Sequence, residues 1–168
     1  MPLEIERKIL EINKRELLAK INRLKPKAEK LFEGLVCVYY FDFPDRRIYK
    51  KKDLLRVREF IPRKKTAYTE LVYKTYRGVK KGCKLFEECE MVFPGNHAAG
   101  LLREFFNRLG LKQTAYYEKR RTLFAYKNVK FEIDEHPRIP PFVEIEGPSA
   151  SAIDRYASRV LTSARRRG

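Results

Sequence analysis

Charged side chains of one sign recur two positions apart along this 168-residue chain. Successive residues of a β-strand point to opposite faces, so residues two apart project from the same face. Paired carboxylates could bind Mg²⁺ or Mn²⁺, which prefer oxygen ligands, and paired cations could bind phosphate oxygens. The carboxylate pairs are Glu4/Glu6, Glu132/Asp134 and Glu144/Glu146, with Glu88/Glu90 as a further pair, and the cationic pairs are Arg56/Arg58 and Lys119/Arg121.

The separation of these pairs by charge type argues against an ordinary solvated sheet, whose outer face carries mixed polar side chains. In the first pair, Lys8 shares the face of Glu4 and Glu6, and the reverse face of that stretch is apolar. Burying many charges is costly unless they pair or bind ions. The pattern therefore favours a barrel lumen that holds a polyanion and a divalent metal, with internal salt bridges and no ligand as the alternative.

Period-two alternation bounded by turn residues predicts eight strands. The expected ranges are 3–11, 35–42, 53–61, 68–77, 85–93, 115–126, 129–135 and a last strand after Pro141 that carries Glu144 and Glu146. The predicted fold class is α+β: an eight-stranded antiparallel β-barrel with flanking helices.

Helical spacing of apolar residues predicts three helices. Two are expected over 14–30 and 97–109, with Asn13 and Asn96 as caps, and a closing helix follows Pro148-Ser149. The second helix is expected to bury one apolar side, made of Leu101, Leu102, Phe105, Phe106 and Leu109.

The length predicts one domain over residues 1–168, with 165–168 as a frayed tail. The cysteines Cys37, Cys83 and Cys89 lack metal-ligand spacing and are expected to be reduced, which favours a cytoplasmic location. Because the N-terminus is charged and the sequence has no long apolar run, we expect neither a signal peptide nor insertion into a membrane.

Lysine and arginine total 38 against 22 aspartate and glutamate residues, which gives a formal net charge of +16. Such an excess attracts polyanions. The lysine clusters fall at predicted turns, where a solvated rim is the simpler interpretation, so specific nucleic-acid binding is not expected.

The order of these motifs resembles the CYTH family of triphosphate tunnel metalloenzymes, which includes class IV adenylyl cyclases, thiamine triphosphatases and tripolyphosphatases. Glu4-x-Glu6-x-Lys8 is similar to the ExExK signature that opens the family. The later motifs follow in the family's order: Tyr40-Phe41-Asp42-Phe43-Pro44, Leu55-Arg56-Val57-Arg58, Tyr73-Lys74, Lys119-x-Arg121, Asp134 and Phe142-Val143-Glu144-Ile145-Glu146.

The resemblance implies an eight-stranded tunnel that binds a small-molecule triphosphate, with Mg²⁺ or Mn²⁺ as cofactor. It implies that five cations hold the phosphates: Arg56, Arg58, Lys74, Lys119 and Arg121. It implies that five carboxylates line the metal side: Glu4, Glu6, Asp134, Glu144 and Glu146.

Further assignments concern catalysis and the remaining carboxylates. Lys8 and Glu6 are expected to act in catalysis, with Lys8 orienting water or holding phosphate. Glu132 is a further metal-side residue, and either Glu88 or Glu90 could point inward.

Three functions remain open from the sequence. The preferred one is a metal-dependent phosphohydrolase that cleaves the terminal phosphoryl group of inorganic, nucleoside or thiamine triphosphate. The second is a class IV adenylyl cyclase, which forms cyclic AMP and pyrophosphate from ATP. The third is a non-catalytic module that binds polyphosphate or RNA ends. The oligomeric state also stays open, a homodimer being one alternative.

Overall fold

The computed structural model describes residues 3–95 and 97–161. The predicted cap at Asn96 and the predicted tail over 165–168 lie outside these residues. The described strands are β1 (Leu3–Ile9), β2 (Glu29–Asp42), β3 (Leu54–Pro62), β4 (Tyr68–Lys80), β5 (Cys83–Pro94), β6 (Lys112–Tyr126), β7 (Val129–His136) and β8 (Ile139–Gly147). The described helices are α1 (Lys14–Asn22), α2 (Arg47–Lys50), α3 (His97–Arg108) and α4 (Ala150–Val160).

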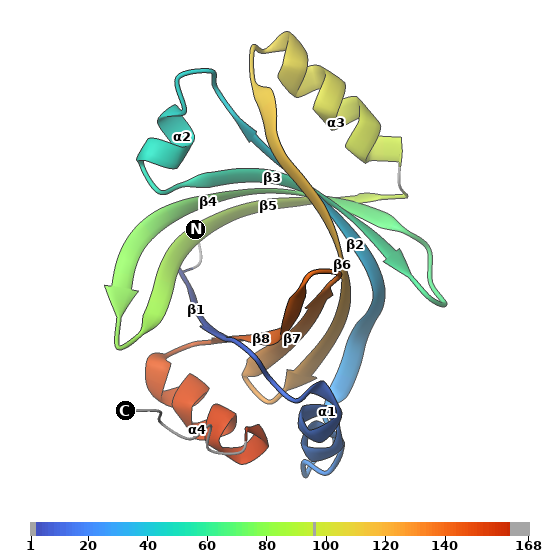
Figure 1. Cartoon of the computed structure of the whole chain (residues 1–168), viewed down its shortest axis with the longest axis vertical. Coiled ribbons are helices and arrows are strands. Elements are labelled where there is room, and N and C mark those ends of the chain that lie inside the picture. Colours follow the sequence, from blue (N-terminus) through green and yellow to red (C-terminus); the bar gives the residue numbers. More distant parts are fainter. Residues whose placement is uncertain (1–2, 96, 162–168) are drawn as a thin grey trace. The chain divides into compact units, whose positions relative to one another are not determined.

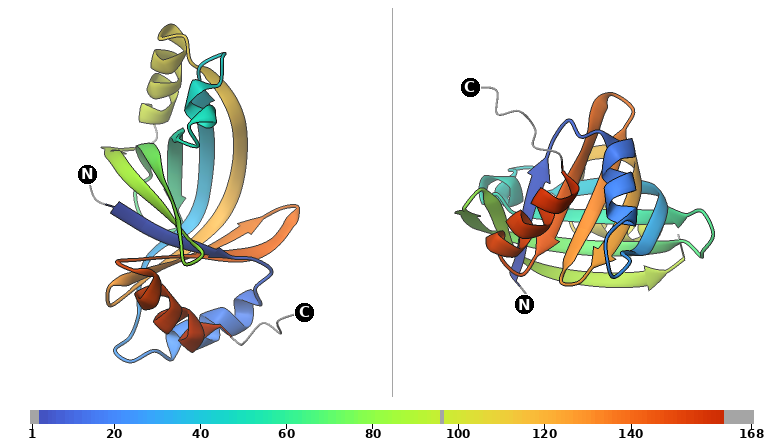
Figure 2. Two further views of the ribbon diagram at one scale, coloured as in Figure 1. Left: turned by 90° about the vertical axis from the view of Figure 1, so that its left-hand side faces the viewer. Right: turned by 90° about the horizontal axis from the view of Figure 1, so that it is seen from below.

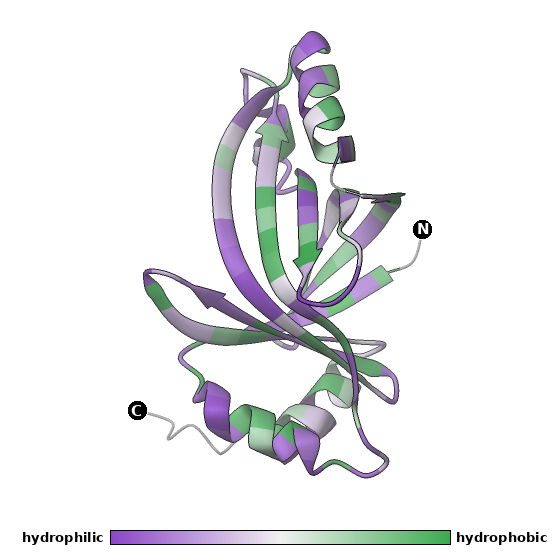
Figure 3. Cartoon of the chain, turned by 90° about the vertical axis from the view of Figure 1, so that its right-hand side faces the viewer, coloured by the Kyte–Doolittle hydropathy of each residue, from purple (hydrophilic) through white to green (hydrophobic). Residues whose placement is uncertain are grey.

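The eight strands form a closed barrel in the order β1-β5-β4-β3-β2-β6-β7-β8 (Figure 1). The registers of the β1–β8, β2–β3, β3–β4 and β7–β8 pairs are antiparallel. Apolar and polar residues alternate along the strands, as the colours of Figure 3 show. The predicted eight-stranded antiparallel barrel with flanking helices is confirmed.

The predicted helix over 14–30 is wrong in its second half. Helix α1 ends at Asn22, and residues from Glu29 onward already belong to β2. Pro26 accounts for the early end, because proline lacks the N–H that a helix interior requires and disfavours helical backbone at the residue before it.

Helix α2 was not predicted. Its single turn is organised by Asp42, whose buried carboxylate accepts hydrogen bonds from the backbone N–H groups of Ile48 and Tyr49 at 3.0 and 2.9 Å. Such side-chain bonds replace the helical partners that a four-residue segment cannot supply for itself.

The chain divides into two compact units, which are described separately. Of the described residues, the first unit contains Leu3, 34–78 and 85–120 except 96, and the second contains 4–33, 79–84 and 121–161. In the second unit, Phe131, Ile133 and Ile145 are at most 1% exposed and form a core with Ile153 of α4. Helices α1 and α4 contact each other there (Figure 2). The predicted cap at Asn13 is confirmed, because its side chain accepts a hydrogen bond from the Glu16 N–H.

In the first unit, α3 covers a core that includes Val57, Tyr39 and Phe41. Only part of its predicted buried side is buried, namely Phe106 and, partly, Leu102. The prediction for the other three residues is wrong, since the exposed fractions of Leu101, Phe105 and Leu109 are 73%, 56% and 56%. Apolar spacing marks an amphipathic helix, but here the apolar stripe is wider than the barrel surface that α3 covers.

No helix within residues 3–95 and 97–161 has the length and the apolar character needed to span a bilayer.

Gly34 is required by close packing between β2 and β3. A Cβ added there would lie 2.2 Å from the Ile61 carbonyl oxygen, whereas one added at Gly100 of α3 would meet nothing within 4 Å. We expect Gly34→Ala to lower the free energy of unfolding by about 1–3 kcal/mol. Gly100→Ala should leave it unchanged or raise it by about 0.5–1 kcal/mol. Urea denaturation measures both, and equal effects of the two variants would contradict this interpretation.

Candidate active site

A basic set of four residues lies in the first unit: Arg56, Arg58, Lys74 and Lys119. Arg56 and Arg58 of β3 stand opposite Val72 and Glu70 of β4 in the antiparallel register. Directly opposed residues share a face, so the face of β3 that carries the arginines continues along β4 through Glu70 and Val72 to Lys74.

Three of these cations are almost fully buried. The exposed fractions are 7% for Arg58, 4% for Lys74 and 5% for Lys119. Because burying a charge is costly, each is expected to have an anionic partner or a ligand.

The described partners satisfy this expectation only in part. Arg58 is ion-paired with Glu70 through a terminal nitrogen, while its buried Nε–H has no hydrogen-bond partner within the described ranges. Lys74 Nζ lies 3.5 Å from Glu88 Oε2. Most buried donors in proteins are hydrogen-bonded, so the Nε–H of Arg58 is a position from which an acceptor on a ligand could bind.

Glu70 is a site residue that the sequence analysis missed. The alternation Glu70-x-Val72-x-Lys74 could have revealed it, because all three residues lie on one face of the same strand. Of the two carboxylates of β5, Glu88 contacts Lys74 and is partly buried, and Glu90 is exposed.

A carboxylate cluster lies in the second unit and consists of Glu132, Asp134 and Glu144. One oxygen from each lies within 4.8 Å of the others. The register of β7 and β8 produces the cluster, because Glu132 stands opposite Glu144 and Asp134 follows two residues later on the same face. Three hard oxygen donors so close together fit a divalent cation such as Mg²⁺ or Mn²⁺.

Arg121 binds this carboxylate cluster. Its Nε and Nη2 each donate to an oxygen of Asp134 at 2.7 Å, and its Nη1 lies 2.5 Å from Glu132 Oε2. The guanidinium is also 3.7 Å from Glu144 Oε2. Burial opposes the charge, but the three carboxylates outweigh it and hold the pKa of Arg121 well above its ordinary value.

Arg121 was expected to hold phosphate together with the other cations, and in the structure its contacts are with the carboxylates. The guanidinium of Arg121 donates a hydrogen bond to each oxygen of the fully buried Asp134. A role for Arg121 in contacting phosphate therefore stays a prediction, whereas its role in positioning Glu132 and Asp134 follows from the contacts.

Strand β1 brings the N-terminal motif alongside the carboxylates. Lys8 stands opposite Glu144 in the β1–β8 register, and its Nζ lies 2.9 Å from Glu144 Oε1. Glu6 stands opposite Glu146. Since Glu4 lies two residues before Glu6, all three residues of the N-terminal motif fall on the β1 face that continues into Glu144 and Glu146.

Glu146 has an altered pKa. Burial raises it above the ordinary value of 4.5, the ammonium of Lys130 lowers it, and the charges of Glu4 and Glu132 raise it again. Lys130 Nζ lies 3.3 Å from Glu146 Oε2. A carboxylate whose ionised form is disfavoured in this way would gain from a bound cation.

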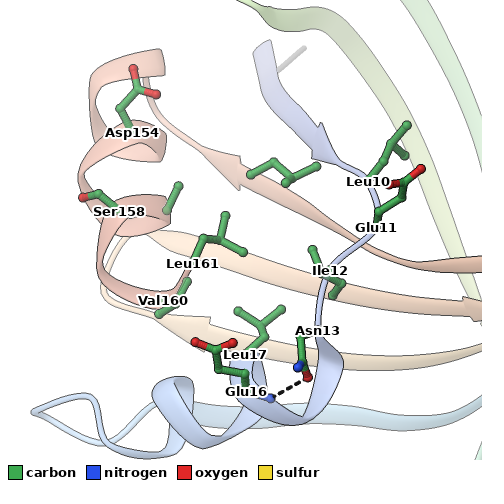
Figure 4. A pocket seen from close by; sticks show the side chains of 12 residues that line it. Leu10, Glu11, Ile12, Asn13, Glu16, Leu17, Asp154, Ser158, Val160 and Leu161 are labelled. Atoms are coloured by element: carbon green, nitrogen blue, oxygen red, sulfur yellow. Dashed lines mark hydrogen bonds between the residues drawn. The ribbon is translucent and has the colours of Figure 1, made fainter. Parts of the chain in front are cut away.

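A cavity of about 480 Å³ lies elsewhere in the second unit, between α1 and α4 (Figure 4). Its lining includes the apolar residues Ile9, Ile12, Leu17 and Leu161 and the carboxylates of Glu11, Glu16 and Asp154. None of the predicted site residues lines it, and its apolar and acidic walls are poorly suited to a triphosphate.

A model of the CYTH domain matches residues 2–157. The chain belongs to the CYTH family. A Pyrococcus furiosus protein of solved structure is 25% identical, with a TM-score of 0.73 over 95% of this chain and 92% of its own. A search of curated proteins found no significant match.

Two other solved structures share the CYTH fold at lower identity. A candidate adenylate cyclase from Vibrio parahaemolyticus is 18% identical, with a TM-score of 0.70 over 94% of this chain and 84% of its own. A Hippeastrum protein, described as a candidate adenylyl cyclase with a dominant triphosphatase activity, is 14% identical, with a TM-score of 0.68 over 91% and 83%. These two show the fold alone.

The raised pKa of Glu146 predicts a pH-dependent stability of the metal-free protein. Because the folded state holds this proton more tightly than the unfolded state, Glu146 makes the free energy of unfolding fall as pH rises from about 4.5 through the raised pKa. The Glu146→Gln variant lacks this titrating group. The difference between its free energy of unfolding and that of wild type should therefore increase with pH across that window. The attraction of Lys130 acts only on the ionised carboxylate, so it opposes this trend and is already contained in the net raised pKa of Glu146.

Urea denaturation of Glu146→Gln and of wild type between pH 4 and 7 tests this. A stability difference between Glu146→Gln and wild type that does not change with pH would refute the assignment.

Proposed function

We propose that this CYTH protein is a divalent-metal-dependent phosphohydrolase that acts on a triphosphate bound in the barrel lumen. The observation that carries the proposal is the gathering of charged side chains on a few strands: the cations Arg58, Lys74 and Lys119 are buried on β3, β4 and β6, and the carboxylate cluster lies on β7 and β8. Family membership supports a triphosphate-acting tunnel enzyme. Phosphoryl transfer needs charge neutralisation and positioning more than covalent chemistry, and these two sets of side chains could supply both.

The basic set would hold the phosphate oxygens. Arg58 has a buried Nε–H available for an acceptor, and Lys74 and Lys119 are buried ammonium groups with three donors each. Such preorganised donors bind a charged group without the cost of ordering them during the reaction. Arg56, opposite Tyr40 and Val72 in the strand registers, would complete the set.

The carboxylate cluster, with Glu4, Glu6 and Glu146, would hold the metal. Bound there, Mg²⁺ or Mn²⁺ would supply neutralisation of phosphate charge. Arg121 would keep Glu132 and Asp134 in place, and Lys8 would hold the carboxylate of Glu144, which it contacts. Glu6 and Lys8 are the residues proposed to orient the attacking water.

Product analysis separates this proposal from the two alternatives. With Mg²⁺ or Mn²⁺, we expect the purified protein to release orthophosphate from inorganic triphosphate, ATP or thiamine triphosphate, and to lose this activity with EDTA. Cyclic AMP with pyrophosphate would instead establish the cyclase. Salt-sensitive binding without turnover on any of the three substrates would establish the non-catalytic module.

A pair of variants on strand β6 tests the basic set. Lys119→Met should lower kcat/KM by about 10²- to 10³-fold, because a buried donor to the substrate is lost. Lys112→Met, seven residues earlier on the same strand and exposed, is the matched control and should retain activity. Equal activities of the two variants would exclude Lys119 from the site.

The carboxylate cluster should bind the metal in the absence of substrate. Mn²⁺ at about 100 times its Kd should raise the free energy of unfolding by about 2.7 kcal/mol. The double variant Glu132→Gln/Glu144→Gln should abolish this stabilisation, measured as the shift in Tm on adding Mn²⁺. Glu135→Gln is the control, since Glu135 points to the other face and pairs with Lys14. A full Mn²⁺ shift in the double variant would place the metal elsewhere.

A further inference from the structure

Two Tyr-Tyr dipeptides, at 39–40 on β2 and 116–117 on β6, meet within the first unit. Within each dipeptide the two tyrosines point to opposite faces of the strand. Each face therefore carries one tyrosine from β2 and one from β6, and these two lie side by side. The rings of Tyr39 and Tyr116 lie 4.9 Å apart, and those of Tyr40 and Tyr117 lie 5.9 Å apart.

The pair on the outer face has a structural explanation. Tyr39 belongs to the core beneath α3, donates to Glu59 Oε2 at 2.7 Å and has the Arg103 guanidinium 4.5 Å from its ring. Tyr116 is bonded to Glu118. Burial and the bond to Glu59 raise the pKa of Tyr39 to about 12, as expected for a packed phenol.

The other pair lies beside the basic set. Tyr40 stands directly opposite Arg56 in the β2–β3 register, so their side chains share a face. Tyr117 is two residues before Lys119, whose Nζ lies 6.0 Å from the Tyr117 ring. Both rings are only partly buried, and their hydroxyls are 3.1 Å apart.

We propose that Tyr40 and Tyr117 form a head-group subsite that selects a nucleoside triphosphate over inorganic triphosphate. The bond between the two hydroxyls holds the two partly buried rings, and with them their ring faces, next to the basic set. A planar base can stack on such faces, whereas a substrate made only of phosphate gains nothing from them. Next to Arg56 and Lys119, the pair lies where the organic end of a substrate would be if its phosphates occupied the basic set.

This inference rests on the proposed function, and its test uses the ratio between two substrates. We compare ATP with inorganic triphosphate in Mg²⁺ for wild type, Tyr40→Leu, Tyr117→Leu and Tyr117→Phe. Each leucine variant should raise KM for ATP roughly tenfold, as expected for the loss of base stacking, and change KM for inorganic triphosphate less than twofold. Tyr117→Phe keeps the ring and should keep the preference.

Tyr116→Leu is the matched control, because it alters the neighbouring tyrosine on the opposite face and should leave the substrate ratio unchanged. Circular dichroism of each variant checks that the barrel is folded. Parallel losses for both substrates in the leucine variants, or no preference for ATP in wild type, would overturn the subsite. A loss in Tyr117→Phe equal to that in Tyr117→Leu would also overturn it, since the hydroxyl would then be the recognition group.

Calorimetric binding of a non-hydrolysable ATP analogue and of imidotriphosphate distinguishes the two levels of failure. A tyrosine-dependent preference in binding without turnover would refute the phosphohydrolase and keep the subsite. Turnover without a tyrosine-dependent preference would refute the subsite and keep the phosphohydrolase.

Discussion

A charge buried in a protein has to be matched, and the fork between Arg121 and Asp134 meets this constraint at the most deeply buried ion pair that the structure describes. The exposed fractions of the two residues are 3% and 0%, and two hydrogen bonds of 2.7 Å join them. The same guanidinium contacts Glu132, so one cation sets the spacing of the carboxylates on β7. Removing one member of such a group leaves an uncompensated buried charge, which typically costs about 3–5 kcal/mol. The geometry of the carboxylate cluster therefore depends on Arg121.

The rule of two-residue alternation explains why most of the fold could be predicted from the sequence. Like charges two apart, such as Arg56 and Arg58, identify strands and the faces that carry their polar groups. Local rules also found the cap at Asn13. Two errors arose from contacts that spacing does not reveal: Asp42 organises α2 through the backbone, and the barrel leaves Phe105 exposed. The early end of α1, by contrast, had a local signal in Pro26.

The site was predictable as a set of residues, but its internal pairing was not. Spacing shows which face a side chain takes, and it does not show which neighbour will be opposite it. The cross-strand register placed Glu70 beside Arg58 and Lys8 beside Glu144. For the same reason, the positive charge of Arg121 suggested phosphate binding, whereas the contacts of Arg121 are with carboxylates. A fold alone does not determine an activity, so the arguments for function rest on these contacts.

The central claim is that the carboxylate cluster binds a metal and the basic set binds a triphosphate. A crystal structure with Mn²⁺ and a non-hydrolysable triphosphate tests it most directly, because anomalous scattering locates manganese independently of the phosphate density. We predict manganese bound to oxygens of Glu132, Asp134 or Glu144 and phosphate oxygens bound to Arg58, Lys74 and Lys119. Manganese bound neither by these carboxylates nor by Glu4, Glu6 or Glu146, or a triphosphate held only by the exposed lysines of the turns, would contradict the claim.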